Sequence, residues 1–311
     1  MKAIRLHARG GPEQLVFEDA PQPLLAPDDA LLRVYATAIT RTELTWDQTY
    51  QYPDGSPRLP TIPGHEVSGI VESLPAGATG LAVGDAVYAL TDFPRDGAAA
   101  EYVGVRAANL ALKPRTIDFV HSAAVTLSGL TAWQALFTHG NLQPGQRVLI
   151  HGGAGGVGVF AVQLAHAKSA HVITTSSAAN FDFLRKLGAD EIIDYTKSRF
   201  EDVVNNIDLV LDAVGGDTVA RSWQVLRPNG MLVSVATPIP SSEPPRHNAR
   251  GLFFIVEPSR EQLDQIAKLI DTGQLHVEIA AVFPLSQARA AFEEALKGHN
   301  RGKIVLEVRR D

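Results

Sequence analysis

Residues 147–158 read Arg-Val-Leu-Ile-His-Gly-Gly-Ala-Gly-Gly-Val-Gly, a short apolar run that leads directly into a cluster of glycines. The apolar run predicts a buried strand, and residues 159–168 after it predict a helix. Gly153, Gly155 and Gly158 have the spacing of a dinucleotide-binding turn, and with Gly156 and Val157 they would bring phosphates to the N-terminus of the helix. The stretch therefore predicts a dinucleotide site; a glycine-rich loop without a ligand is the alternative.

The sequence on either side of this turn alternates between strand-like and helix-like segments. The expected strands are residues 147–151, 170–175, 191–194, 207–212 and 231–236, with 252–256 as a sixth. Strands that alternate with helices are parallel and form a doubly wound sheet of the Rossmann type. The proline-rich stretch 238–245 predicts a surface loop.

The two ends of the chain have a different pattern. Near the N-terminus, Pro/Gly turns separate short β-type runs, which predicts an antiparallel, barrel-like β domain with strands at residues 2–8, 30–39, 66–72, 85–90 and 99–105. Near the C-terminus, Ser259 begins a capping box that predicts a helix ending before Gly273. A helix over 286–297 and a strand over 303–308 follow.

Composition excludes several classes of protein. The 311 residues, 45% of them apolar, suffice for two lobes, and the net charge of −6 without a basic run argues against nucleic-acid or membrane partners. The absence of cysteine excludes disulfides, thiolate nucleophiles and cysteine-ligated zinc. No signal-peptide pattern begins the chain, and no run approaches the roughly 20 apolar residues of a membrane-spanning helix. We therefore expect a cytoplasmic protein.

The end of the second expected strand bears on the choice of nicotinamide cofactor. Enzymes specific for NAD place a carboxylate there to hold the ribose 2′-hydroxyl. This chain instead has Ser176, Ser177 and Asn180, which could donate hydrogen bonds to a 2′-phosphate, with Arg185 and Lys186 as counter-charges or as ordinary solvated residues. This chemistry favours NADPH over NADH.

The chain resembles the medium-chain dehydrogenase/reductase family, specifically its quinone oxidoreductase (zeta-crystallin-like) and enone reductase branch. Four stretches carry the resemblance: Pro-Gly-His-Glu-Val-Ser-Gly at 63–69, Val-Gly-Asp-Ala-Val at 83–87, residues 127–135, and Arg-Gly-Lys-Ile-Val-Leu at 301–306. Residues 145–163 also resemble the quinone oxidoreductase signature. The chain departs from that signature only at His166, where a basic residue or serine is usual. The resemblance implies an α/β protein with a GroES-like, β-rich catalytic domain (1–121 and 257–311) and a Rossmann NADPH-binding domain (122–256). A cofactor cleft would lie at their junction.

Zinc-dependent members of the resembled family hold catalytic zinc at positions that correspond here to Thr40, His65 and Leu127. Only His65 is a ligand type, whereas such a zinc ion needs about three or four protein ligands. The stretch 91–99 is also too short for the structural zinc lobe and has no cysteine. We therefore expect no metal, and the alternative for His65 is a hydrogen-bonded wall residue.

Further cofactor neighbours are expected at several positions. The general rule for open α/β sheets indicates backbone groups at Val214, Ala236 and Thr237, near the carboxyl ends of strands. The resemblance adds Thr131, Tyr195, Phe254 and Val256, although packing is the alternative for each. It also implies a homodimer, in which the strand at 252–256 pairs with its copy.

Without zinc, hydride transfer favours an acceptor whose conjugation spreads the developing charge, such as a quinone or an α,β-unsaturated carbonyl. Donors expected near such a substrate are the hydroxyls, with His65 as a possible acid, and none can be singled out: Thr40, Thr42, Tyr50, Tyr52 and Thr126. Residues 50–60 predict a surface loop that could cap the cleft. An enoyl-thioester reductase, a non-enzymatic NADPH-binding protein and a zinc alcohol dehydrogenase are the alternatives, the last disfavoured by the missing cysteines.

Overall fold

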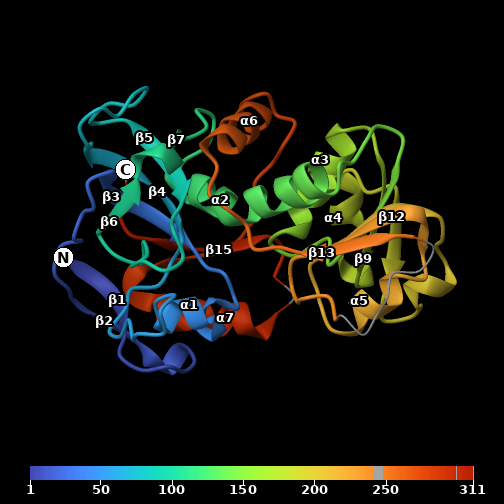
Figure 1. Ribbon diagram of the computed structural model, residues 1–311, viewed down its shortest axis with the longest axis horizontal. Coiled ribbons are helices and arrows are strands. Elements are labelled where there is room, and N and C mark those ends of the chain that lie inside the picture. Colours follow the sequence, from blue (N-terminus) through green and yellow to red (C-terminus); the bar gives the residue numbers. More distant parts are fainter. Residues whose placement is uncertain (241–247, 299, 311) are drawn as a thin grey trace. The chain divides into compact units, whose positions relative to one another are not determined.

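The computed structural model describes residues 1–240, 248–298 and 300–310, so residues 241–245 of the expected proline-rich loop (238–245) lie outside the described residues. The chain forms two compact units (Figure 1). Unit 1 comprises Met1–Leu127, Glu257–Thr272 and Val277–Asp311, and unit 2 comprises Ser128–Val256 and Gly273–His276. The predicted Rossmann domain spans 122–256, whereas compact unit 2 begins at Ser128 and also includes Gly273–His276. The domain boundaries after residues 121 and 256 therefore stay a prediction.

Unit 2 contains a six-stranded sheet in the order β10-β9-β8-β11-β12-β13, and every neighbouring pair is parallel. Its strands are β8 (Arg147–His151), β9 (His171–Ser176), β10 (Glu191–Asp194), β11 (Ile207–Asp212), β12 (Leu226–Ser234) and β13 (Arg250–Phe253). This confirms the doubly wound Rossmann sheet. The order reverses between β8 and β11, and ligands of such sheets bind at that point, beyond the carboxyl ends of the strands.

Helices cover both faces of this sheet. α3 (Gly158–Ala167) and α4 (Phe181–Lys186) lie on one side and α5 (Asp217–Ser222) on the other (Figure 1), as right-handed crossovers in opposite directions require. The two central strands, β8 and β11, are largely apolar and buried, with Leu149 and Val210 at 0% exposure. Burial on both faces explains why these strands read as unbroken apolar runs in the sequence.

Unit 1 is built around a seven-stranded sheet to which both ends of the chain contribute. Its order is β14-β15-β3-β4-β5-β7, with β6 also paired to β3. The strands are β3 (Asp29–Ala38), β4 (Glu66–Ser73), β5 (Ala86–Leu90), β6 (Tyr102–Arg106), β7 (Ala111–Leu112), β14 (Ile279–Pro284) and β15 (Lys303–Glu307). Strand β15 pairs with β3, Val305 opposite Ala38. The expected β-rich domain from both chain ends is therefore present.

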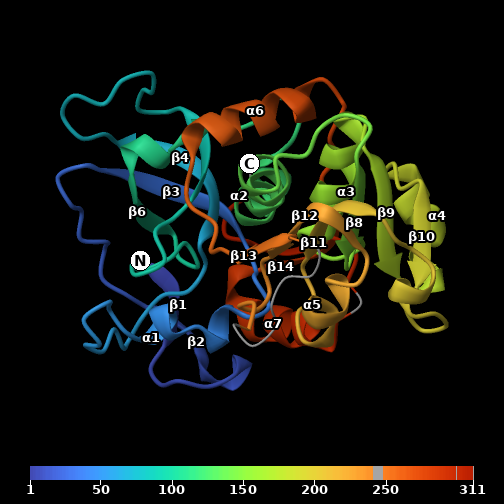
Figure 2. The same cartoon turned by 45° about the vertical axis from the view of Figure 1, so that its right-hand side comes forward.

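The remaining elements lie around these sheets. A separate hairpin consists of β1 (Lys2–Leu6) and β2 (Leu15–Asp19). The helices are α1 (Asp47–Tyr50), α2 (Phe119–Trp133), α6 (Arg260–Asp271) and α7 (Ala288–Lys297), which Figure 2 shows from a second direction. No helix in the described part of the chain has the length and apolar character needed to cross a bilayer.

Candidate functional site

The glycine-rich turn connects β8 to α3 in unit 2. A Cβ atom on Gly153 would collide with the Thr174 side chain, and one on Gly158 would collide with the Gly152 carbonyl, so internal packing requires these glycines. A Cβ on Gly155 would have the Gly152 carbonyl oxygen as its nearest neighbour, at 3.3 Å. The fold therefore leaves more room at Gly155, as a backbone that approaches a pyrophosphate requires.

Neighbouring strand ends hold and border this turn. Thr175, near the end of β9, accepts a hydrogen bond from the Gly152 N–H at its Oγ1 and one from the Gly153 N–H at its carbonyl oxygen, both 3.2 Å. A Cβ on Gly152 would lie 3.0 Å from Val214 Cγ2, so the turn after β11 lies against the glycine turn. The structure thus brings Val214, which is 55% exposed, beside the expected phosphate site.

A second group of predicted residues gathers beyond β9. Asn180 Nδ2 donates to Ser176 Oγ at 3.0 Å and lies 3.4 Å from Ser177 Oγ. Tyr195 follows β10, donates its backbone N–H to the Ser176 carbonyl at 3.4 Å and has an exposed side chain. The hydroxyls, the amide and the tyrosine therefore share one edge of the sheet, at the carboxyl ends of β9 and β10.

The other predicted cofactor neighbours are spread over unit 2. Thr237 lies against Gly215, where an added Cβ would be 2.9 Å from Thr237 Cγ2 and 3.2 Å from Ala236 Cβ. Phe254 packs against His139, with ring centroids 4.4 Å apart. Thr131, within α2, and Val256 are buried. The structure thus brings Val214, Ala236 and Thr237 together at the ends of β11 and β12.

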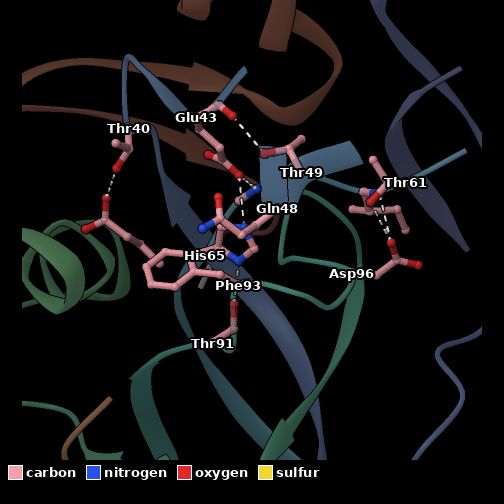
Figure 3. A network of polar contacts seen from close by, with 12 residues as sticks. Thr40, Glu43, Gln48, Thr49, Thr61, His65, Thr91, Phe93 and Asp96 are labelled. Atoms are coloured by element: carbon pink, nitrogen blue, oxygen red, sulfur yellow. Dashed lines mark hydrogen bonds and ion pairs between the residues drawn. The ribbon is translucent and has the colours of Figure 1, made fainter. Parts of the chain in front are cut away.

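In unit 1, His65 lies at the centre of a polar and aromatic cluster (Figure 3). Its Nδ1 is 3.0 Å from Thr91 Oγ1, and its Nε2 is 3.5 Å from Glu43 Oε1. Phe93 meets the ring edge-on at 5.0 Å and Trp46 stacks at 6.3 Å. Burial, reinforced by the Arg58 cation, lowers the pKa of His65 to about 3. The imidazole is therefore neutral near pH 7, which argues against its expected role as an acid.

Glu43 is a member of this cluster that sequence reasoning missed. Its Oε1 accepts the Gly64 N–H at 2.5 Å, and the side chain is buried. Burial raises the pKa of Glu43 to about 7, against the lowering effect of that hydrogen bond, and the nearby Glu66 carboxylate raises it further. In the sequence, Glu43 stands next to the expected hydroxyl donors Thr40 and Thr42. A carboxylate beside threonines is equally typical of a solvated turn, so this pattern does not predict a buried carboxyl.

Thr40 belongs to a second, charged network. Its hydroxyl donates to Glu66 Oε1 at 3.2 Å, and the Lys303 ammonium lies 2.5 Å from the same oxygen. Lys303 also donates to the Ile39 carbonyl, and Leu127 N–H donates to Glu66 Oε2. The buried Glu66 and Lys303 side chains neutralise each other, as buried charges must. The Thr40 proton is therefore directed to Glu66 in this arrangement.

The remaining predicted donors differ in access. The Tyr50 side chain is buried, and its hydroxyl donates to the Leu44 carbonyl at 2.8 Å. The buried Thr126 hydroxyl points to the Ala123 carbonyl of its own helix at 3.4 Å. Tyr52, by contrast, is 46% exposed. The segment 50–60 is thus only partly the expected surface loop, because Tyr50 and Arg58 are buried within unit 1.

The residues at the three family zinc positions do not fit a catalytic zinc ion. Thr40 donates to Glu66, Leu127 offers an apolar side chain, and both His65 nitrogens face Thr91 and Glu43. Across the described residues, no group of three histidine or acidic side chains is placed to hold a metal. The described residues of unit 1 therefore offer no ligand set for zinc.

Comparisons with known proteins agree with this architecture. Residues 26–115 match the alcohol dehydrogenase GroES-like domain, and residues 187–306 match the zinc-binding dehydrogenase family. The chain belongs to the medium-chain dehydrogenase/reductase family. Within that family it is similar to quinone oxidoreductases and to reductases of conjugated carbonyl compounds.

Two curated relatives and two solved structures illustrate the similarity. A probable mitochondrial zinc-binding oxidoreductase of Arthroderma benhamiae is 31% identical, covering 93% of this chain and 91% of the relative. The chloroplastic NADPH-dependent alkenal/one oxidoreductase of Arabidopsis thaliana is 32% identical, covering 98% and 79%. The quinone oxidoreductase structure from Coxiella burnetii has a TM-score of 0.92 at 33% identity, covering 99% of both chains. That of Escherichia coli, complexed with NADPH, has a TM-score of 0.86 at 26% identity, covering 99% and 100%.

Proposed function

We propose that this oxidoreductase uses NADPH to reduce a quinone or the conjugated double bond of an enone or enal, without zinc. The observation that carries the proposal is that the family zinc positions hold Thr40, His65 and Leu127, of which only His65 has a zinc-ligating side chain. A plain ketone gains most from a Lewis acid, whereas a conjugated acceptor spreads the developing charge over several atoms. The relatives named for alkenals and quinones support the same acceptor class.

The residues of unit 2 fit a dinucleotide. Backbone N–H groups of the turn from Gly153 to Gly158 would hold the pyrophosphate, with the N-terminus of α3 behind them. Ser176, Ser177 and Asn180 would donate to the 2′-phosphate, beside Tyr195. Val214, Ala236, Thr237, Thr131, Phe254 and Val256 would lie toward the ribose and nicotinamide. When bound, reduced nicotinamide supplies the hydride.

The chain's own task at the acceptor is orientation, exclusion of water and stabilisation of the oxygen that gains charge. Among the predicted donors, the Tyr50 and Thr126 hydroxyls are directed to backbone carbonyls, whereas Tyr52 and Thr42 are exposed. An enolate or hydroquinone oxygen needs only one hydrogen-bond donor or a water molecule. We therefore propose that donors share this role and that removing any one costs less than about 10² in rate.

A panel of acceptors tests the proposal. NADPH absorbance is followed with a small quinone, an enone and a simple ketone, each with and without a chelator. The proposal expects oxidation with the quinone or the enone, little with the ketone, and no effect of the chelator. Efficient, chelator-sensitive ketone reduction would overturn the zinc-free assignment.

The same assay separates the alternatives. An enoyl-thioester as the best substrate would assign the chain to enoyl-thioester reduction. Tight NADPH binding without oxidation by any acceptor would favour a non-enzymatic NADPH-binding protein. We also propose that the protein is a homodimer that pairs through the sheet edge at β13. A solution mass of twice the chain would support this. A cytoplasmic location is a further proposal, which cell fractionation would test.

A further inference from the structure

His151 is a buried histidine that the proposed reaction does not use. It ends β8, directly before the glycine turn, and has 0% exposure. Its Nδ1 lies 3.3 Å from Thr175 Oγ1, and its Nε2 lies 3.1 Å from Ser222 Oγ, in α5. The His151 ring therefore connects Thr175, the residue of β9 that holds the glycine turn, with Ser222 at the end of α5.

The partners of this ring fix the direction of each hydrogen bond. The Ser222 hydroxyl donates to the Thr218 carbonyl at 2.6 Å, so its oxygen accepts from His151 Nε2–H. Nδ1 is then the unprotonated nitrogen and accepts from the Thr175 hydroxyl. Thr175 Oγ1 keeps its lone pairs for the Gly152 N–H, at 3.2 Å. One continuous chain of donors therefore runs from Gly152 through Thr175 and His151 to Ser222.

This direction requires a neutral ring. Burial lowers the pKa of His151 to about 4, against the opposing effect of the Asp212 carboxylate. Asp212 is itself occupied, because its Oδ1 accepts from the Val214 and Gly215 N–H groups and its Oδ2 accepts from the Thr218 hydroxyl. The same helix, α5, thus joins the His151 chain to the turn after β11.

We propose that His151 is a positioning residue for the dinucleotide turn: through the Thr175 hydroxyl it fixes the Gly152 N–H and the start of the phosphate-binding backbone. The inference rests on the proposed NADPH site. Gly152 adopts φ +78° and begins the turn, so its orientation determines where the following N–H groups point. Without His151, the Thr175 hydroxyl would lose its fixed orientation and would hold the Gly152 N–H less firmly. We expect this to weaken phosphate binding and to leave the rate of hydride transfer unchanged.

Titration calorimetry with 2′-phospho-ADP-ribose, which lacks the nicotinamide, tests this directly. His151→Phe keeps a planar aromatic ring, somewhat larger than imidazole, and removes both hydrogen bonds, and we expect about tenfold weaker binding with kcat at saturating NADPH within about twofold. Thr175→Val should weaken binding to a similar extent. The double variant should also be about tenfold weaker, because both substitutions break one chain. Losses that multiply to about a hundredfold would show independent effects and overturn the proposal.

Matched variants separate positioning from general loosening. Val219→Ala opens a cavity in the buried core beside Ser222 without touching the hydrogen-bond chain, so it should lower the melting temperature and leave the dissociation constant unchanged. Equal weakening by Val219→Ala, or unchanged binding by folded His151→Phe, would overturn the proposal.

If His151→Phe fails to fold, Ser222→Ala takes its place. It removes the acceptor that fixes the ring, and we expect about threefold weaker binding; no change would overturn the proposal. Failure of the wild-type protein to bind 2′-phospho-ADP-ribose would instead refute the proposed NADPH function.

Discussion

Gly155 tests whether the glycine turn binds the cofactor. Its added Cβ would meet only the Gly152 carbonyl, at 3.3 Å, so Gly155→Val should fold. The branched side chain would occupy the space of the pyrophosphate, and we expect NADPH to bind roughly 100-fold more weakly, through lost charge-assisted hydrogen bonds. Calorimetry on the folded variant gives the affinity. Unchanged affinity would mean that the cofactor binds elsewhere.

Ser176 tests the choice of cofactor. Ser176→Asp would place a carboxylate beside Asn180 and Ser177, where it would repel a 2′-phosphate. We expect the ratio of NADPH to NADH affinity to fall at least roughly tenfold. Ser176→Asn, which is neutral and of similar shape to the aspartate, is the control and should change the ratio little. A ratio that does not move with the aspartate would remove Ser176 from the adenosine ribose.

Glu43 predicts a pH dependence of stability. Its pKa is raised from 4.5 to about 7, so the contribution of the protonated carboxyl is present below pH 4.5 and is lost as pH rises through 7. Relative to Glu43→Gln, the wild-type protein should lose on the order of 3 kcal/mol over this range. Urea unfolding of both proteins from pH 4.5 to 7.5 measures the difference.

The comparison of wild-type protein with Glu43→Gln also separates the pH effect of Glu43 from that of His65. The lowered pKa of His65 has the opposite effect, since its contribution is present above pH 6.5 and is lost progressively as pH falls toward 3, but it is common to both proteins. A difference in unfolding free energy that stays constant with pH would contradict the raised pKa of Glu43.

The site residues differ in how far the sequence could predict them. The glycines and the Ser176 cluster follow from local spacing, because a turn between a strand and a helix is a local structure. Glu43 and Tyr50 depend on which segments pack around them, and no short pattern contains that information. Hence the sequence gives no sign that the Tyr50 hydroxyl is directed to a carbonyl or that Glu43 faces His65.

Among the elements, α6 follows most directly from local rules. Ser259 caps it as expected, with its Oγ accepting the Gln262 N–H at 3.3 Å. Ser259→Ala should lower the free energy of unfolding by about 1 kcal/mol. Ser259→Asp keeps an acceptor and should restore most of this loss. Chemical denaturation compares the three proteins, and equal stability of all three would show that the cap contributes nothing.

Three strands escaped prediction: β2, β14 and the two-residue β7. Strand β2 has consecutive exposed apolar residues, Val16 and Phe17, and β14 is a wholly apolar edge strand that ends in Pro284, so neither sequence shows the usual alternation of polar and apolar residues. Strand β12 begins at Leu226 and passes through Pro228, Asn229 and Gly230, which are typical turn residues. The register with β11 passes from Leu226 directly to Met231, so these turn residues form an irregularity within the strand.

At the scale of the whole molecule, the parallel sheet of unit 2 was predictable because β8, β9 and β11 are each followed by a crossover helix, α3, α4 and α5 respectively. The sheet of unit 1 was less predictable, because β15 near the C-terminus pairs with β3 near the N-terminus. Only the family resemblance indicated that arrangement. The proposed function uses a glycine turn for the dinucleotide in unit 2 and a polar cluster in unit 1 whose described residues offer no zinc ligand set.

The position of the transferred hydrogen in the product tests this account most directly. NADPH that carries deuterium at the transferred position of the nicotinamide is incubated with the enzyme and an enone, and the product is examined by NMR. The account predicts a saturated ketone with deuterium on the carbon that was β to the carbonyl. An allylic alcohol with deuterium on its carbinol carbon would contradict it, because direct carbonyl reduction is the chemistry for which this cluster provides no Lewis acid.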